Sequence, residues 1–214
     1  MSRFLIGLDL AQSCDFTAIA ILERKELKGP WDAVQFDHRK MAGLQLRYLE
    51  RVPKGTPYPE VVHRVRTVTR SGELSGECSL IVDATGVGRA VVDMLRTGGL
   101  DAACRILPVQ ITSGHSETQV NGYYHVPKKD LIVGLQVLLQ RGGLKIAAGM
   151  TFAGALVEEL TQMRVKIAES GHEQYGAWRS GEHDDLVLAV ALGHWGAGKL
   201  HWPVTGDDGY WRHQ

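Results

Sequence analysis

The chain has 214 residues, and its 24 lysine and arginine side chains balance 24 aspartate and glutamate side chains, so its formal net charge is zero. Hydrophobic residues make up 44% and charged residues 22% of the sequence, which is typical of a globular domain and excludes global disorder. No apolar run reaches the roughly 18 residues that span a bilayer, the N-terminus lacks a signal-peptide pattern, and the cysteines predict neither a disulfide framework nor a zinc site.

In the first half of the chain, segments with the pattern of strands are interrupted by segments whose apolar residues have helical spacing. Apolar runs predict strands, of which the first two form a hairpin, over residues 4–10, 17–22, 33–38, 79–83 and 105–111. The run over 79–83 is apolar throughout, as in a strand buried on both faces, whereas Pro108 predicts an edge position for the last strand. Between the strands, valines at helical spacing from 61 to 68 indicate one helix, and a second helix is expected over about 89–96.

The second half is predicted to be mainly helical. Helices are expected over residues 131–139, 151–163 and 186–192, with a hairpin over 164–178. Asp130 is expected to cap the first of these helices, and Asp184 or Asp185 opens the last one. Strands followed by alternating strands and helices predict a mixed-sheet α/β fold. Because no linker or repeat divides the sequence, we expect one domain over residues 1–196 and a tail over 197–214.

Four aspartates share one kind of position, at the end or the start of a strongly apolar element. Asp9 and Asp83 end predicted strands, and Asp184 and Asp185 begin the last helix. Any one of them alone reads more simply as a loop-end or helix-cap residue. Together they predict a shared site, because ligands of open α/β sheets bind at the carboxyl ends of strands. A divalent cation relieves the repulsion among such carboxylates, and two Mg²⁺ or Mn²⁺ ions about 3.5–4 Å apart can hydrolyse a phosphodiester.

The sequence resembles the nuclease domain of phage large terminase subunits over residues 7–17, 81–88, 127–132, 138–146 and 181–191. The most specific stretch is Glu-His-Asp-Asp-Leu-Val at 182–187. The resemblance implies an RNase H-like fold, in which helices flank a mixed β-sheet, and metal-dependent cleavage of DNA. The metal ligands that it implies are Asp9, Asp83 and one of Asp184 and Asp185, with Asp15 as an additional acid near the site.

The resemblance also implies partners and a setting. The substrate is double-stranded DNA, which this family cuts from phage concatemers during packaging in the cytoplasm of a bacterial host. The sequence contains no G-x-x-x-x-G-K-[ST] P-loop, the motif of the ATPase motor in a complete large terminase, and the candidate partners are a separate ATPase motor, the small terminase subunit or the portal. Whether the chain is an excised domain or a stand-alone relative stays open.

Residues that flank the acids are expected to contact DNA or to orient a neighbouring side chain. Lys128, Lys129, Arg164 and Lys166 lie in flanking segments. Scattered lysines usually form solvated surfaces, but in an enzyme that cuts a polyanion they are candidate phosphate contacts. Such contacts carry no base readout, so cleavage with little sequence preference is expected. His183 precedes the paired acids and is expected to orient a neighbour rather than to bind metal.

Three other functions stay open beside a two-metal DNA endonuclease. A Holliday junction resolvase of the same general fold would act as a dimer on four-way junctions. An actin-like or sugar-kinase-like nucleotide binder also begins with an acid after a glycine-containing strand, but it needs a second phosphate hairpin that is not evident in the sequence. A catalytically silent interaction module would not require an acid at every one of these positions.

Overall fold

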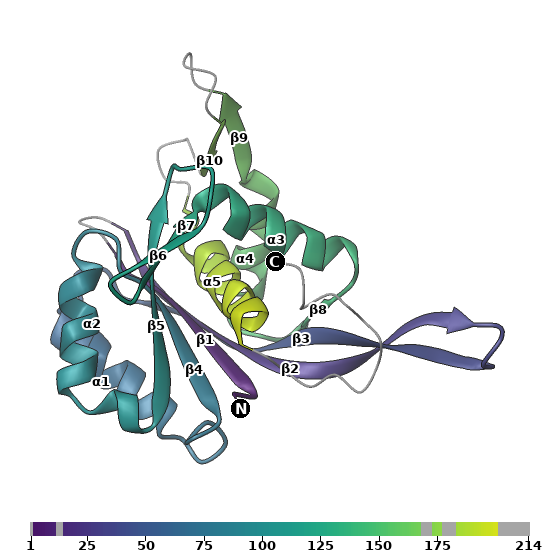
Figure 1. The fold of residues 1–214 in the computed structure, drawn as a ribbon, viewed down its shortest axis with the longest axis horizontal. Helices are drawn as coiled ribbons and strands as arrows, with labels where there is room; N and C mark the ends of the chain where they lie inside the picture. The colour runs from purple at the N-terminus through teal and green to yellow at the C-terminus, as the bar shows by residue number, and fades with distance from the viewer. Residues whose placement is uncertain (1, 12–14, 168–172, 177–182, 201–214) are drawn as a thin grey trace.

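The computed structural model describes residues 2–11, 15–167, 173–176 and 183–200. Its centre is an eight-stranded mixed sheet with the strand order β6-β7-β5-β4-β1-β2-β3-β8 (Figure 1). The strands of this sheet are β1 Phe4–Asp9, β2 Thr17–Asp32, β3 Asp37–Val52, β4 Cys78–Asp83, β5 Cys104–Thr112, β6 Thr118–Val120, β7 Tyr123–Pro127 and β8 Leu144–Ile146. A separate ladder joins β9 Arg164–Ile167 and β10 Glu173–Gly176. The helices are α1 Tyr58–Thr69, α2 Gly88–Thr97, α3 Lys128–Gln140, α4 Ala153–Gln162 and α5 Asp185–Lys199, with a short 3-10 helix, η1, at Leu100–Ala102.

Helices cover both faces of the sheet, which divides the core into two layers (Figure 1). α1 and α2 pack on one face, over a cluster that includes Ile6 and Val91. α3, α4 and α5 cover the other face, over a cluster that includes Leu5, Leu135 and Leu156. The strands β1, β4, β5 and β7 run parallel, whereas β2 is antiparallel to both β1 and β3. The predicted mixed-sheet α/β fold is therefore confirmed.

The last helix, α5, packs on β1 and β2 and is buried on nearly every side. Its close approach depends on Gly7, because a Cβ at this position would overlap the carbonyl oxygen of Ala189. At the other end of the helix, Nη2 of Arg24 donates to the carbonyl oxygens of Ala197 and Leu200, at 2.8 and 2.7 Å. These bonds satisfy acceptors that the last turn of a helix leaves open. Together the contacts fix where α5 begins, and therefore where its N-terminal acids lie.

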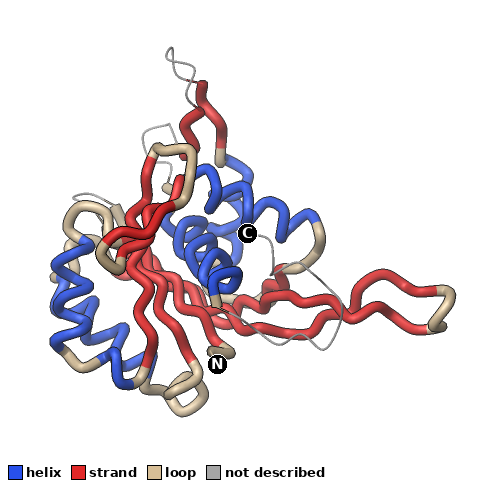
Figure 2. Tube along the Cα trace, viewed as in Figure 1, coloured by secondary structure: helices blue, strands red, loops and turns tan. Residues whose placement is uncertain are grey.

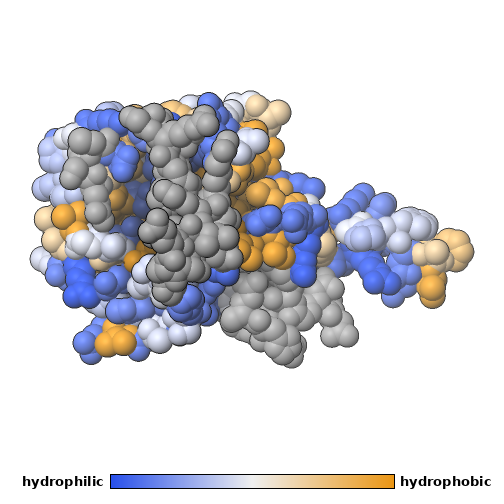
Figure 3. All heavy atoms as spheres, turned by 90° about the horizontal axis from the view of Figure 1, so that it is seen from above, coloured by the Kyte–Doolittle hydropathy of each residue, from blue (hydrophilic) through white to orange (hydrophobic). Residues whose placement is uncertain are grey.

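The strands β2 and β3 continue beyond the sheet as a projecting two-stranded arm (Figures 1 and 2). They stay paired up to Asp32 and Asp37, and the turn between these residues exposes the apolar side chains of Val34 and Phe36. The tip is visible as an apolar patch at the far end of the molecule in Figure 3. The predicted strand over 33–38 is therefore wrong. Residues 33–36 form an exposed turn, and only residues 37 and 38 belong to a strand.

Two other predicted positions are also wrong. β5 lies between β4 and β7 instead of at an edge of the sheet. Pro108 is tolerated there because the pairing of β5 with β7 begins only at Val109, one residue later. Asp130 does not cap α3, since the helix begins at Lys128, directly after Pro127. The carboxylate of Asp130 lies instead in the first turn, where it is favourable to the helix dipole.

The C-terminal part of the chain and three short strands also differ from the expected elements. α5 continues through Lys199 into the expected tail, and residues 201–214 of that tail lie outside the described residues. β6, β7 and β8 were not predicted, because strands this short carry little periodicity. Among the described helices, none combines the length and the apolar character needed to cross a membrane.

Candidate metal centre

Asp9 and Asp83 lie side by side at the carboxyl ends of adjacent parallel strands. β1 and β4 pair with Leu8 opposite Val82, so the next residue of each strand is one of these aspartates. Both aspartates are buried. Carboxylates held this close, and away from water, repel each other unless they share a proton or a cation.

The electrostatics of the site reflect this crowding. Burial raises the pKa of Asp9 well above its ordinary value, and the charges of Asp83, Asp184 and Asp185 raise it further. Burial also raises the pKa of Asp83, although hydrogen bonds with Thr85 and Asp9 oppose the rise. Asp9 is therefore a carboxyl group whose ionised form needs a positive partner.

The turn after β4 holds Asp83 in place. The backbone N–H of Thr85 donates to Oδ1 of Asp83 at 2.8 Å. Gly88 allows α2 to begin directly against this turn, because a Cβ there would overlap the carbonyl oxygen of Asp83. Gly88 thus allows the start of α2 and the end of β4 to lie close together beside the acids.

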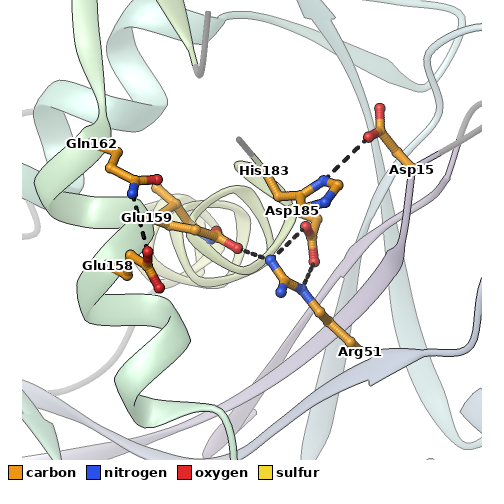
Figure 4. A network of polar contacts seen from close by, with 8 residues as sticks. Asp15, Arg51, Glu158, Glu159, Gln162, His183 and Asp185 are labelled. Atoms are coloured by element: carbon orange, nitrogen blue, oxygen red, sulfur yellow. Dashed lines mark hydrogen bonds and ion pairs between the residues drawn. The ribbon is translucent and has the colours of Figure 1, made fainter. Parts of the chain in front are cut away.

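The start of α5 brings two more acids to the same edge of the sheet, with different neighbours. Asp184, at the N-cap position, accepts a hydrogen bond from Nζ of Lys128 at 2.7 Å. Asp185 accepts two hydrogen bonds from Arg51 of β3, from Nε to Oδ2 at 2.8 Å and from Nη2 to Oδ1 at 3.0 Å (Figure 4). The side chain of Asp184 is 25% exposed and that of Asp185 only 4%. The two adjacent aspartates therefore have separate surroundings.

Glu159 of α4 completes the group around Arg51 (Figure 4). It pairs with the guanidinium, and its Oε2 accepts the backbone N–H of Val187 at 3.0 Å. Burial raises the pKa of Glu159 to about 8, and the charge of Asp185 adds to the rise. The sequence reasoning missed both Arg51 and Glu159. Charged residues in an alternating strand and in an amphipathic helix read as solvent-facing, and no local pattern reveals a bond to a residue 134 positions away.

The predicted auxiliary residues Asp15 and His183 lie next to each other. Nδ1 of His183 is 3.5 Å from Oδ1 of Asp15 (Figure 4). The ring of Phe16 meets the His183 ring edge-on, with 5.1 Å between the centroids. The same Phe16 ring carries two cations, Arg51 at 5.0 Å and Lys54 at 4.4 Å from its centroid. The loop after β1 is thereby joined to the segment that precedes α5.

The four predicted DNA contacts fall into three situations. Lys128 pairs with Asp184 inside the acidic group. Lys129, the next residue, is exposed. Arg164 and Lys166 lie on β9, and their side chains are outside the described part of the structure. As phosphate contacts, all four stay predictions.

The donor chemistry of this edge fits a divalent cation. Within the described residues, no three histidine, cysteine, aspartate or glutamate side chains lie closely enough together to form a complete metal-binding group. Lys128 and Arg51 instead supply positive charge to Asp184 and Asp185. The edge nevertheless offers oxygen donors, and a bound Mg²⁺ or Mn²⁺ would offset the burial and the repulsion that together raise the pKa of Asp9.

Comparison with known proteins gives matches in fold alone. No protein-family model matches the sequence, and no curated protein does. The large terminase nuclease of thermophilic phage G20c is 21% identical, with a TM-score of 0.60, and the match covers 89% of this chain and 80% of that one. The nuclease domain of the large terminase subunit of bacterial virus Sf6 is 13% identical, with a TM-score of 0.62, and the match covers 95% and 90%.

A third match adds the nuclease domain of the bacteriophage SPP1 large terminase, 10% identical with a TM-score of 0.54 and with 92% and 87% of the two chains covered. That domain carries bound manganese, and the G20c nuclease has been solved with magnesium and with cobalt. These likenesses confirm the expected architecture. The chain has the RNase H-like fold of phage large terminase nuclease domains, as one domain with helices on both faces of a mixed sheet.

Proposed function

We propose that this chain is a metal-dependent endodeoxyribonuclease that hydrolyses double-stranded DNA with two Mg²⁺ or Mn²⁺ ions and little sequence preference. The observation that carries the proposal is the convergence of acids from distant parts of the chain. Asp9 and Asp83 end adjacent parallel strands, and Asp184 and Asp185 begin the helix that packs over them. The same fold in the G20c and SPP1 terminase nucleases, which hold divalent metals, supports it.

Each acid has a role in this proposal. Asp9 and Asp83 would hold metal together with one or both acids of the Asp184–Asp185 pair, because carboxylates offer the oxygen ligands that Mg²⁺ and Mn²⁺ prefer. When bound, two such ions supply an activated water and stabilise the leaving oxygen of the phosphodiester. Asp15 and His183 are proposed as auxiliary residues, since they pair with each other beside the site.

The proposal for DNA rests on charge. Lys128, Lys129, Arg164 and Lys166 would contact phosphates, which adds affinity that falls with salt but carries no sequence information. We further propose that the DNA is phage DNA delivered in the host cytoplasm by a packaging motor, with a separate ATPase, the small terminase subunit or the portal as partners. The fold shared with large terminase nucleases supports this setting.

Cleavage of supercoiled plasmid tests the proposal. The purified chain should nick and linearise the plasmid with Mn²⁺ or Mg²⁺ and leave it intact with EDTA. Asp9→Asn and Asp83→Asn should abolish cleavage, because the amide keeps the shape but not the charge that holds the cation. Asp93→Asn, at an exposed position of α2, is the matched control and should cut like the parent.

Cleavage in EDTA, or by Asp9→Asn at the parent rate, would contradict the proposal. A strong preference for four-way junctions over plasmid would instead indicate a junction resolvase on the same fold.

A further inference from the structure

Arg51 joins two acids that lie 108 and 134 positions away in the sequence. Its guanidinium donates through two nitrogens to the two oxygens of Asp185, and it pairs with Glu159 at the same time (Figure 4). A planar guanidinium that binds both oxygens of a carboxylate fixes the orientation of that carboxylate as well as its position. Asp185 is therefore held in one direction, toward β3.

Glu159 acts on the backbone of the same helix. Its Oε2 accepts the N–H of Val187, one of the amides that the first turn of α5 leaves without an intrahelical partner. Asp184, although it is at the N-cap position, makes no side-chain capping bond to α5 among the described residues. The cap comes from α4 instead, which leaves the carboxylate of Asp184 available for its contact with Lys128.

The group is buried, with side-chain exposures of 17% for Arg51, 5% for Glu159 and 4% for Asp185. Removing one partner from a buried group that is joined by ionic and hydrogen-bonding contacts leaves the other partners unsatisfied, so the group acts as a unit. Arg51 also lies in the same row of the sheet as Asp9. Asp9 is opposite Ala18 on β2, and Ala18 is opposite Arg51 on β3, so the three residues form one row across the sheet.

We infer that Arg51 and Glu159 are positioning residues, which hold Asp185 and the first turn of α5 so that Asp184 is the acid of the pair that serves the metal site with Asp9 and Asp83. The inference rests on the proposed function, because it assigns roles within the same metal site. It gives the adjacent aspartates different tasks: Asp185 anchors the helix start, and Asp184 supplies the ligand.

Mn²⁺ affinity, measured by isothermal titration calorimetry on the full chain, tests these roles. Asp184→Asn should weaken Mn²⁺ binding about 100-fold, whereas Asp185→Asn, whose carbonyl oxygen still accepts from Arg51, should stay within about 3-fold of the parent. Arg51→Met and Glu159→Ala should each weaken binding about 10-fold, as is found for residues that orient metal ligands. Glu159→Gln keeps an acceptor for Val187 and should restore most of the affinity.

Controls separate positioning from a purely structural role. All titrations are made well below the melting temperature of every variant, so that a residue which only stabilises the fold leaves the Mn²⁺ affinity unchanged. Arg39→Met removes the same charge from the projecting arm and should bind Mn²⁺ like the parent. If Arg51→Met does not fold, Glu159→Ala and Asp185→Asn still decide the question.

Equal losses of affinity in Asp184→Asn and Asp185→Asn would overturn the inference, as would parent-like affinity in both Arg51→Met and Glu159→Ala. Neither result affects the proposed function. That proposal fails separately, if Asp9→Asn and Asp83→Asn bind Mn²⁺ as tightly as the parent.

Discussion

The ammonium of Lys128 lies 2.7 Å from Oδ2 of Asp184, which joins the start of α3 to the start of α5. Its charge also opposes the rise in the pKa values of Asp9 and Asp83 that burial produces. One lysine therefore acts on three acids from three elements. Any cation that these acids bind is therefore repelled by the ammonium of Lys128.

Replacing Lys128 should strengthen metal binding. In Lys128→Met the acids lose their positive neighbour, and an incoming divalent ion no longer meets a like charge, so Mn²⁺ should bind about 10-fold more tightly, a gain of about 1.4 kcal/mol. Calorimetric titration of the full chain measures this. Lys129→Met, at the exposed neighbouring position, is the control and should leave the affinity unchanged. Unchanged or weaker binding in Lys128→Met would show that the lysine does not compete with the metal.

Neutralising Asp9 should stabilise the fold when divalent metal is withheld. The carboxyl group is buried among like charges, and Asn keeps its shape without the repulsion. In EDTA at neutral pH, Asp9→Asn should melt about 3 °C above the parent, which corresponds to about 1 kcal/mol for a chain of this size. Scanning calorimetry measures the shift, with Asp93→Asn as the exposed control. A lower melting temperature would mean that the Asp9 carboxylate stabilises the fold.

Gly7→Ala tests the packing of α5 on β1. The added Cβ would overlap the carbonyl oxygen of Ala189, and neither backbone can yield without moving the helix. We expect a loss of about 3 kcal/mol in the free energy of unfolding, the upper part of the usual range for overpacking. Urea unfolding measures it. Gly154→Ala in α4 has open space at its Cβ and should be neutral or stabilising by up to about 1 kcal/mol. Equal effects at the two positions would contradict the close approach.

His194 should make stability depend on pH. Burial in α5 lowers its pKa from 6.5 to about 4, so the folded state keeps the imidazole neutral while the unfolded chain takes up a proton. The stability that this provides is present above pH 6.5 and is lost as the pH falls toward 4, by about 3 kcal/mol in total.

Urea unfolding at several pH values between 7.5 and about 4.5 measures that loss. In His194→Gln the unfolded chain takes up one proton fewer, so the free energy of unfolding should depend less steeply on pH. His63→Gln, at an exposed position of α1, is the control and should unfold with the pH dependence of the parent. If the parent and His194→Gln show the same slope, His194 is not the group responsible.

The local pattern of the sequence was enough to predict the class of fold and the positions of the acids along the chain. Runs of apolar residues mark where β1 and β4 end, and the strands end at Asp9 and Asp83 as expected. The apolar stretch after Asp185 likewise marks the start of α5. These features depend on neighbours within one element, and periodicity and residue type are sufficient to reveal them.

The partners of the acids were decided only by the tertiary structure. Arg51 reaches Asp185 because the register of β1, β2 and β3 sets it in the row of Asp9, and Glu159 reaches Val187 because α4 packs beside the start of α5. Both contacts join residues that are distant in sequence, and their side chains look like ordinary surface charges in isolation. Sheet register and helix packing set such distances, and these arise from the burial of apolar surface across the whole domain rather than from the residues next to each charge.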